Sequence, residues 1–188
     1  MKQVSRSPLW SMRLYWEKPD KHQTKEIEMK FICSIIVVED IYRSRKLYED
    51  ILCQKVISDF GEYNVTYEGG LAFYKKSLYQ QLLGDKTIMN RSNNFELYFE
   101  VDNLAEIEEV ILKQGFEFIH KIKEEPWKQP VFRFYDYDNN NVCIAERMER
   151  VSYRLFKENK TISEISQLTG IPEDQILQHL KEFEDIVS

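Results

Sequence analysis

The sequence is short of glycine, of basic residues and of long apolar runs, and each shortage excludes a class of function. Six glycines in 188 residues provide neither a phosphate-cradling loop of the Walker or dinucleotide type nor a G-x-S-x-G nucleophile turn. The 26 basic residues are outnumbered by 32 acidic ones, and the net charge of −6 argues against a broad surface for nucleic-acid phosphates. No run of about 18 apolar residues occurs, so the sequence predicts no membrane-spanning helix.

Cysteine and histidine are also scarce. The cysteines, Cys33, Cys53 and Cys143, are widely spaced and form no C-x-x-C pair, so they predict no disulfide framework and suit a reducing cytoplasm. The first 28 residues lack the continuous apolar core of a secretory signal, which also favours a cytoplasmic protein. The three histidines lie in different segments without a partner at ligand spacing, and His120, at the end of an expected strand, is predicted to be exposed.

The composition is that of a globular protein with a packed core, because 43% of the residues are hydrophobic and 13% aromatic. Residues 1–28 show neither helical nor strand periodicity, and we interpret them as a poorly anchored extension. Residues 29–146 are the expected main domain, and residues 147–188 a helical tail.

The main domain contains a degenerate repeat. "FICSIIVV" predicts a buried strand and "DIYRSRKLYEDIL" a helix, and three short strands follow; "FELYFEV" and "NLAEIEEVILKQG" then open the same order again. Asn103 and Glu106 have capping-box spacing at the start of the second helix. Val38 to Ile41 recurs as Val101 to Leu104, an offset of 63 residues (101 minus 38). The predicted fold class is therefore α+β, with paired βαβββ modules at 29–89 and 94–146 and a small C-terminal helical subdomain.

The strand "FELYFEV" has two different faces. Its alternation predicts one apolar face toward the helix, made of Phe95, Leu97, Phe99 and Val101. The opposite face carries Glu96, Tyr98 and Glu100. A polar and aromatic face of this kind is typical of a ligand cleft. The alternative is that the same side chains simply face solvent.

The segment "FRFYDYDNNNVCIAE" predicts two strands joined by an acidic turn. Asp136 and Asp138 are expected to shape the turn through hydrogen bonds to the backbone, with asparagines taking its left-handed positions. One short turn supplies too few oxygens for Ca²⁺. Arg133, just before the turn, is either a partner for a ligand carboxylate or an ordinary exposed arginine.

The tail resembles a helix-turn-helix in its capping signals. Thr161 and Glu164 form a capping box, Gly170 ends one helix and Pro172 begins the next. From Thr161 onward there are six acidic residues and one lysine, a local charge of −5, so DNA binding is not expected. Its regularly spaced apolar residues predict a small bundle that docks on the main domain or on a second subunit.

The ordered motifs resemble the glyoxalase/bleomycin-resistance/dioxygenase (vicinal oxygen chelate) superfamily over residues 29–146. The matching positions are Asp40, Ser44, Tyr48, Glu49 and Leu52 in the first helix and Asp136 to Asn139 in the last turn. Metal-dependent members hold a divalent ion with three protein ligands. The resemblance places Cys33, Glu96 and Cys143 at those positions, and only Glu96 is a usual ligand there. We therefore expect no cofactor and no catalytic metal, with a Cys-Glu-Cys zinc site as the alternative.

The function predicted first is metal-free binding of a planar or aromatic small molecule, as in the sequestering members that the resemblance includes, by a homodimer. The expected ligand contacts are Tyr98, Trp127, Phe134, Phe73 and Arg133, unless the aromatic residues only fill the core. One alternative is a lyase, isomerase or dioxygenase in which Glu96 acts as metal ligand or general base. Another is a ligand-sensing transcription regulator.

Overall fold

The computed structural model describes residues 29–187, so the predicted extension at 1–28 lies outside the described part. The described residues divide into two compact units. One contains residues 31–124 and 130–147, and the other contains the loop 125–129 and the helices from residue 148 onward. Each unit is described by itself below.

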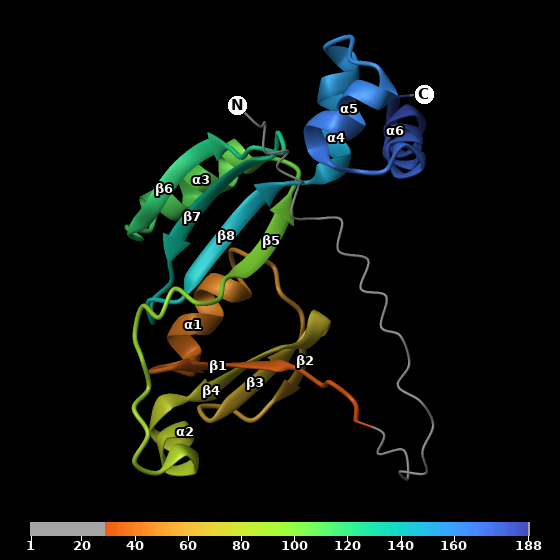
Figure 1. Ribbon diagram of the computed structural model, residues 1–188. Helices are drawn as coiled ribbons and strands as arrows, with labels where there is room; N and C mark the ends of the chain where they lie inside the picture. The colour runs from red at the N-terminus through yellow and green to blue at the C-terminus, as the bar shows by residue number, and fades with distance from the viewer. Residues whose placement is uncertain (1–28, 188) are drawn as a thin grey trace, which may run out of the picture. The chain divides into compact units, whose positions relative to one another are not determined.

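The larger unit contains two four-stranded sheets of the same topology (Figure 1). The first has the strand order β1-β4-β3-β2 and the second the order β5-β8-β7-β6. In each sheet the first and last strands are parallel and the other pairs antiparallel. The bounds are β1 (Ser34–Val38), β2 (Val56–Asp59), β3 (Asn64–Tyr67), β4 (Leu71–Lys75), β5 (Leu97–Val101), β6 (Phe118–Glu124), β7 (Pro130–Tyr135) and β8 (Asn141–Glu146). This arrangement confirms the predicted α+β fold with paired βαβββ modules.

Each module has its helix directly after its first strand. Helix α1 (Ile41–Tyr48) begins at Asp40, whose carboxylate accepts a hydrogen bond from the Arg43 N–H at 3.2 Å. Helix α3 (Leu104–Lys113) begins at Asn103, which accepts from the Glu106 N–H at 3.3 Å. The predicted cap at Asn103 is thus confirmed.

A further helix was not predicted. Helix α2 (Lys76–Leu83) continues directly from β4. It is followed by residues 84–96, which join the two modules and which we call the linker. The sequence of α2, "KSLYQQLL", consists mostly of good helix formers, but its capping position is Lys75, which makes no side-chain cap. The missing cap left no start signal in the sequence.

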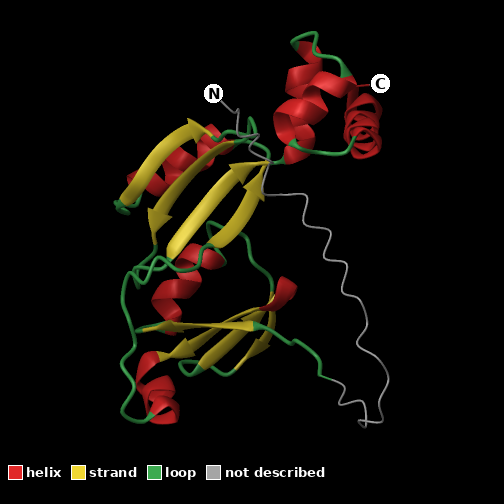
Figure 2. Ribbon diagram, in the orientation of Figure 1, coloured by secondary structure: helices red, strands yellow, loops and turns green. Residues whose placement is uncertain are grey.

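One hydrophobic core joins the two modules. Helix α1 lies between the two sheets (Figure 2), and buried residues from both modules pack into a single cluster around it. The cluster contains Ile36, Val38, Ile41, Leu47, Tyr48, Val65, Tyr67 and Phe73 from the first module and Leu104, Ile111, Phe132, Phe134, Val142 and Ile144 from the second. Burial of this common cluster therefore stabilises both modules together.

Two predicted ligand contacts belong to this core. The Phe73 side chain is fully buried, with its ring centroid 4.5 Å from that of Tyr48 and 5.4 Å from that of Tyr67. Phe134 is equally buried, 5.4 Å from Phe116. The prediction that Phe73 and Phe134 line a cleft is wrong, because alternation along β4 and β7 turns both rings to the core face. The alternative, that they fill the core, is correct.

The smaller unit is a three-helix bundle with its own core. Helices α4 (Met148–Lys157), α5 (Ile162–Thr169) and α6 (Glu173–Val187) bury Val151, Leu155, Ile165, Ile176 and Leu180 together. The predicted capping box at Thr161 is confirmed, and Gly170 takes the left-handed conformation (φ 77°) after α5. Among the residues that the structure describes, no helix combines the length and apolar character needed to cross a bilayer.

Candidate functional site

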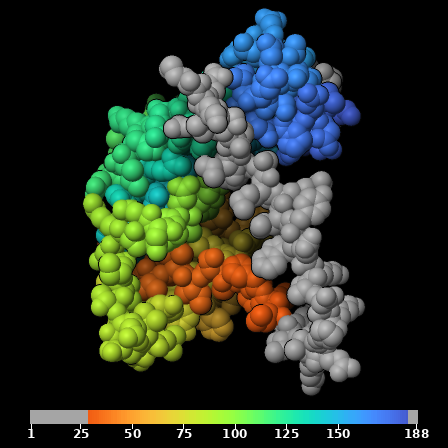
Figure 3. Space-filling view, in the orientation of Figure 1, coloured from red at the N-terminus to blue at the C-terminus, as the bar shows by residue number. Residues whose placement is uncertain are grey.

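A cavity of about 480 Å³ lies where the two modules meet, and we call it the junction cavity. Its walls are β1, the linker, the start of β5 and the turn between β7 and β8, with the side chains of Glu39 and Lys76. The first strand of each module, β1 and β5, is an edge strand of its sheet. In the space-filling view the linker, in yellow-green, borders β1, in orange (Figure 3). The volume falls in the range of roughly 300–1,000 Å³ that small-molecule sites occupy.

The linker wall is held in place by Arg91. Its guanidinium donates to the Glu117 carboxylate at 3.1 Å and to the Asn139 side-chain oxygen at 2.9 Å. The same group stacks 4.6 Å from the ring centroid of Tyr135. These contacts attach the linker to the second module and so fix the polypeptide that carries Met89 into the cavity wall.

The turn between β7 and β8 is built around one buried carboxylate. Asp136 Oδ1 accepts hydrogen bonds at 2.8 Å from the N–H groups of Asp138 and Asn140, and Asn139 takes a left-handed conformation (φ 63°). The predicted turn chemistry is therefore confirmed for Asp136 and Asn139, but not for Asp138, whose carboxylate binds the first module instead. Asp136 Oδ2 also accepts from the Tyr48 hydroxyl at 2.9 Å, a contact across 88 positions of sequence that local signals could not reveal.

Asp138 connects the turn to the start of α1. Its carboxylate accepts from the Glu39 N–H at 2.8 Å and from the Ser44 hydroxyl at 3.4 Å. Burial raises the pKa of Asp138 above its usual value, and the negative charges of Asp136 and Glu39 act in the same direction. At the cavity wall, Glu39 forms an ion pair with Lys76.

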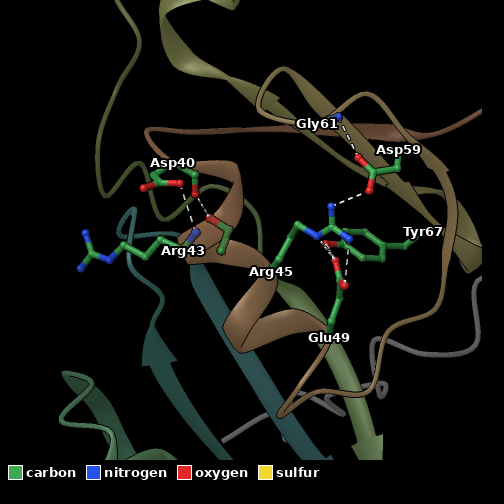
Figure 4. Close-up of polar contacts among 8 residues, drawn as sticks. Asp40, Arg43, Arg45, Glu49, Asp59, Gly61 and Tyr67 are labelled. Atoms are coloured by element: carbon green, nitrogen blue, oxygen red, sulfur yellow. Dashed lines mark hydrogen bonds and ion pairs between the residues drawn. The ribbon is translucent and has the colours of Figure 1, made fainter.

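A polar network fixes the other end of α1 (Figure 4). The Arg45 guanidinium pairs with Asp59 of β2 at 2.6 Å and with Glu49 at 2.7 Å, and the Tyr67 hydroxyl donates to Glu49 at 3.1 Å. Asp59 also accepts from the Gly61 N–H at 2.7 Å, and the Arg45 guanidinium lowers the pKa of its carboxyl. None of these side chains lines the junction cavity, so their role is to hold α1 on the first sheet.

Glu96 is the one predicted site residue that lines the cavity. Its carboxylate accepts from Arg133 Nε at 2.8 Å, and Arg133 Nη1 lies 3.1 Å from His120 Nε2. His120 Nδ1 is 2.9 Å from the Lys121 carbonyl oxygen; this pattern assigns the proton of a neutral ring to Nδ1. His120 is half-buried, so the prediction that it is exposed is wrong; it is held on the sheet by Arg133.

The remaining predicted contacts lie elsewhere. Tyr98 is 47% exposed on the second sheet, and its hydroxyl donates to Glu100 at 2.8 Å. Trp127 belongs to the smaller unit, where its indole N–H donates to Gln129 at 2.8 Å. Phe95 was expected on the core face, but it precedes β5, is 39% exposed and lines the cavity. The sequence analysis missed this wall, although the apolar pair Ile88 and Met89 inside a polar linker was a signal that could have indicated it.

The three residues at the family's metal positions do not fit a catalytic ion. Cys143 is fully buried in a small cluster with Val131 and Ala145, and Glu96 is engaged by the Arg133 cation. Cys33 precedes β1, in the other module. Within residues 29–187, no group of three histidine, cysteine or acidic side chains is arranged to hold a metal ion. Two thiols and one carboxylate are also an unusual donor set for an open, oxygen-ligated ion.

Comparison with known proteins now identifies the family. Residues 31–149 match the family model of the glyoxalase-like domain, and the chain belongs to this family. A crystal structure of a protein of unknown function from Agrobacterium tumefaciens C58 is similar at 30% identity and TM-score 0.56, covering 65% of this chain and 98% of that one. No curated protein matches the sequence significantly.

Two further solved structures share the fold at lower identity. A glyoxalase/bleomycin resistance protein/dioxygenase family enzyme from Burkholderia phytofirmans PsJN is 17% identical, with TM-score 0.53 over 63% of this chain and 98% of that one. A lactoylglutathione lyase from Agrobacterium tumefaciens is 11% identical, with TM-score 0.50 over 65% and 96% of the two chains. These two structures support the fold, and the family-model match over residues 31–149 confirms the resemblance drawn from the sequence.

Proposed function

We propose that this glyoxalase-like protein binds a small molecule in the junction cavity without using a metal ion. The observation that carries the proposal is the cavity itself, whose walls come from both modules. The residues at the family's metal positions support the metal-free part, because Glu96 is paired with Arg133 and Cys143 is buried among apolar neighbours. Sequestration of a drug or metabolite, without turnover, is the corresponding role.

The cavity wall has the composition of a small-molecule site. Ile35, Met89 and Phe95 provide an apolar wall, and their side chains are 46%, 72% and 39% exposed. Amide groups from Asn90, Asn139 and Asn140 and the carboxylates nearby provide polar contacts. Apolar walls supply affinity, and a few fixed polar groups orient the ligand.

A thermal-shift screen against aromatic metabolites, antibiotics and divalent ions tests the proposal, because a ligand that binds the folded state raises the Tm. For a compound that does so, Phe95→Ala is expected to weaken binding about tenfold, since covering a large aromatic side chain is worth on the order of 1.5 kcal/mol or more. Phe60→Ala is the matched control, because Phe60 is 64% exposed and does not line the cavity. Equal effects of both substitutions would place the ligand elsewhere.

Metal analysis tests the metal-free part independently. Protein purified without chelator is expected to contain far less than one equivalent of any divalent transition metal. A stoichiometric metal that is lost in Cys33→Ser and in Glu96→Gln would contradict this expectation and favour the zinc alternative.

The hydrogen-bonded chain of Glu96, Arg133 and His120 favours an enzyme as the second candidate. It places two titratable groups on either side of a fixed cation, an arrangement that can position a base beside a substrate. The test is product formation, followed by NMR, from any compound that raises the Tm. Turnover that disappears in Glu96→Gln while the compound still binds would establish catalysis over sequestration.

The expected homodimer and the regulator remain proposals. The edge strand β2 and the loop after it expose Ile57 and Phe60 by 62% and 64%, and light scattering after size exclusion measures whether two copies associate. For the regulator, α6 carries Glu173 and Asp174 in its first turn, which disfavours phosphate contacts. A salt-dependent DNA shift assay is expected to show no specific complex.

A further inference from the structure

The junction cavity has an unbalanced set of charges. Its described lining residues include three carboxylates, Glu39, Glu96 and Asp138, and a single cation, Lys76. Lys76 is already paired with Glu39, and Glu96 is paired with Arg133. Asp138 is the carboxylate for which the described residues provide no basic partner, since its hydrogen bonds come from a backbone N–H and a hydroxyl.

The surroundings of Asp138 add negative charge. Asp136 belongs to the same turn. Its carboxylate accepts hydrogen bonds from the Tyr48 hydroxyl, from two backbone N–H groups and from the Asn140 side-chain amide. Within the described residues, neither aspartate forms an ion pair. A half-buried carboxylate without a counter-ion is costly, and the raised pKa of Asp138 is consistent with that cost.

Carboxylate oxygens also line the cavity at the start of β5. Glu96 accepts a hydrogen bond from Arg133 Nε, and Arg133 itself does not line the cavity. A bound molecule that carries N–H donors would therefore meet carboxylate acceptors from both the turn and the residues that open β5.

We infer that the junction cavity selects small organic cations, in which an amine or guanidinium group is attached to an apolar, planar body. This inference rests on the proposed function and narrows it to a ligand class. The cationic group lies toward Asp138 and Glu39, and the apolar body lies against Ile35, Met89 and Phe95. Charge-assisted hydrogen bonds at a partly desolvated wall provide the selectivity.

Three probes with the same naphthalene body test the inference: 2-naphthylmethylamine, 2-naphthalenemethanol and 2-naphthoate. Their dissociation constants are measured by calorimetry at low ionic strength and neutral pH. The amine is expected to bind at least about tenfold more tightly than the alcohol, and the carboxylate most weakly. The preference is expected to shrink as salt is added, because exposed charges at the cavity mouth are screened.

Asp138→Asn is the informative variant, because its amide oxygen can still accept from the Glu39 N–H while the charge is removed. The preference for the amine is expected to fall to about threefold or less. Glu39→Gln provides the same test if Asp138→Asn is unstable, since Glu39 is 62% exposed. Asp85→Asn removes a carboxylate that is 91% exposed and lies outside the cavity, and it should leave the preference unchanged.

The outcomes separate the two proposals. Equal binding of amine and alcohol, tighter binding of the carboxylate, or a preference that survives in both cavity variants would overturn the cation inference while leaving small-molecule binding in place. If none of the three probes binds and the wider screen gives no Tm shift, the proposed function fails, and the inference fails with it.

Discussion

The two modules have the same topology, but their helices α1 and α3 differ in the side chains that face the rest of the molecule. At the repeat offset, Ser44 and Tyr48 of α1 correspond to Ile107 and Ile111 of α3. Both polar side chains donate hydrogen bonds to the aspartate turn of the second module, whereas Ile107 and Ile111 contribute only to the apolar core. The repeat thus explains why the two modules have the same topology. The residues that differ between α1 and α3 explain why polar side chains meet at the turn of the second module.

The turns between the last two strands of each module differ as well: the one in the second module is polar, and the one in the first is rich in glycine. The second module has five residues from Asp136 to Asn140, whose carboxylates reach α1. The first module has Glu68 to Gly70 at the equivalent place, with Gly69 and Gly70 at φ 78° and 85°. At φ 85° the backbone of Gly70 has a conformation that residues with a Cβ rarely adopt, so this position favours glycine. The carboxylates of the second module's turn thus bind α1 of the first module, and the junction cavity lies beside this turn.

In both modules the helix is fixed to the second strand by a side-chain contact, but different residue types form that contact. Arg45 of α1 pairs with Asp59 of β2, and at the repeat offset Glu108 of α3 accepts from the Ile122 N–H of β6 at 2.6 Å. In each case a side chain in the middle of the helix is fixed to the second strand of its sheet. The geometry of the module is retained although the residue types have changed.

The largest predicted effect is on the polar helix contact. Tyr48→Phe leaves the buried Asp136 carboxylate without its hydroxyl donor and is expected to lower the free energy of unfolding by about 1–3 kcal/mol. The matched change in α3, Ile111→Val, removes one methylene and should cost about 0.5–1.5 kcal/mol. Denaturant unfolding measures both. If Tyr48→Phe costs less than Ile111→Val, the hydroxyl contact does not distinguish the modules.

A smaller effect is expected at the helix-to-strand contact. Arg45→Gln removes a cation that is 23% exposed from between Asp59 and Glu49, and should destabilise by on the order of 0.5–1 kcal/mol. Glu108→Gln keeps an acceptor for the Ile122 N–H and should be close to neutral. Thermal unfolding at low and high salt checks the pair: the effect of Arg45→Gln should shrink with salt, and a salt-independent loss would indicate packing instead.

The smallest effect concerns pH. Because the pKa of Asp138 is raised in the folded protein, the folded state binds its proton more tightly than the unfolded state does. Its contribution to stability is therefore greatest at low pH and is lost as the pH rises through the raised pKa. Asp138→Asn is expected to be slightly more stable than the parent near neutral pH, by less than about 1 kcal/mol, with the difference vanishing toward the ordinary aspartate pKa. A constant difference across pH 4–8 would contradict this assignment.

Sequence signals predicted what depends on local pattern. Alternation in "FELYFEV", the caps at Asn103 and Thr161 and the turn at Asp136 are encoded within a few residues, and the structure has them. Phe73 and Phe134 were misplaced because an aromatic residue has the same signature on either face of a strand. The cavity required the position of the linker relative to β1, which follows from Arg91 binding to Glu117 and Asn139 in the other module. Glu96 was found from two signals: its place on the polar face of "FELYFEV" and the position that the family resemblance assigns to it.

A core built jointly by both halves has a consequence for any attempt to divide the chain. Severing the linker near Asn90 would leave α1 without the second sheet that covers it, and Asp136 without its phenol partner. Either fragment made alone should therefore collect as insoluble material, whereas the two produced together should recover a folded assembly. The two repeated modules thus form a single folding unit, because each buries its apolar face against the other.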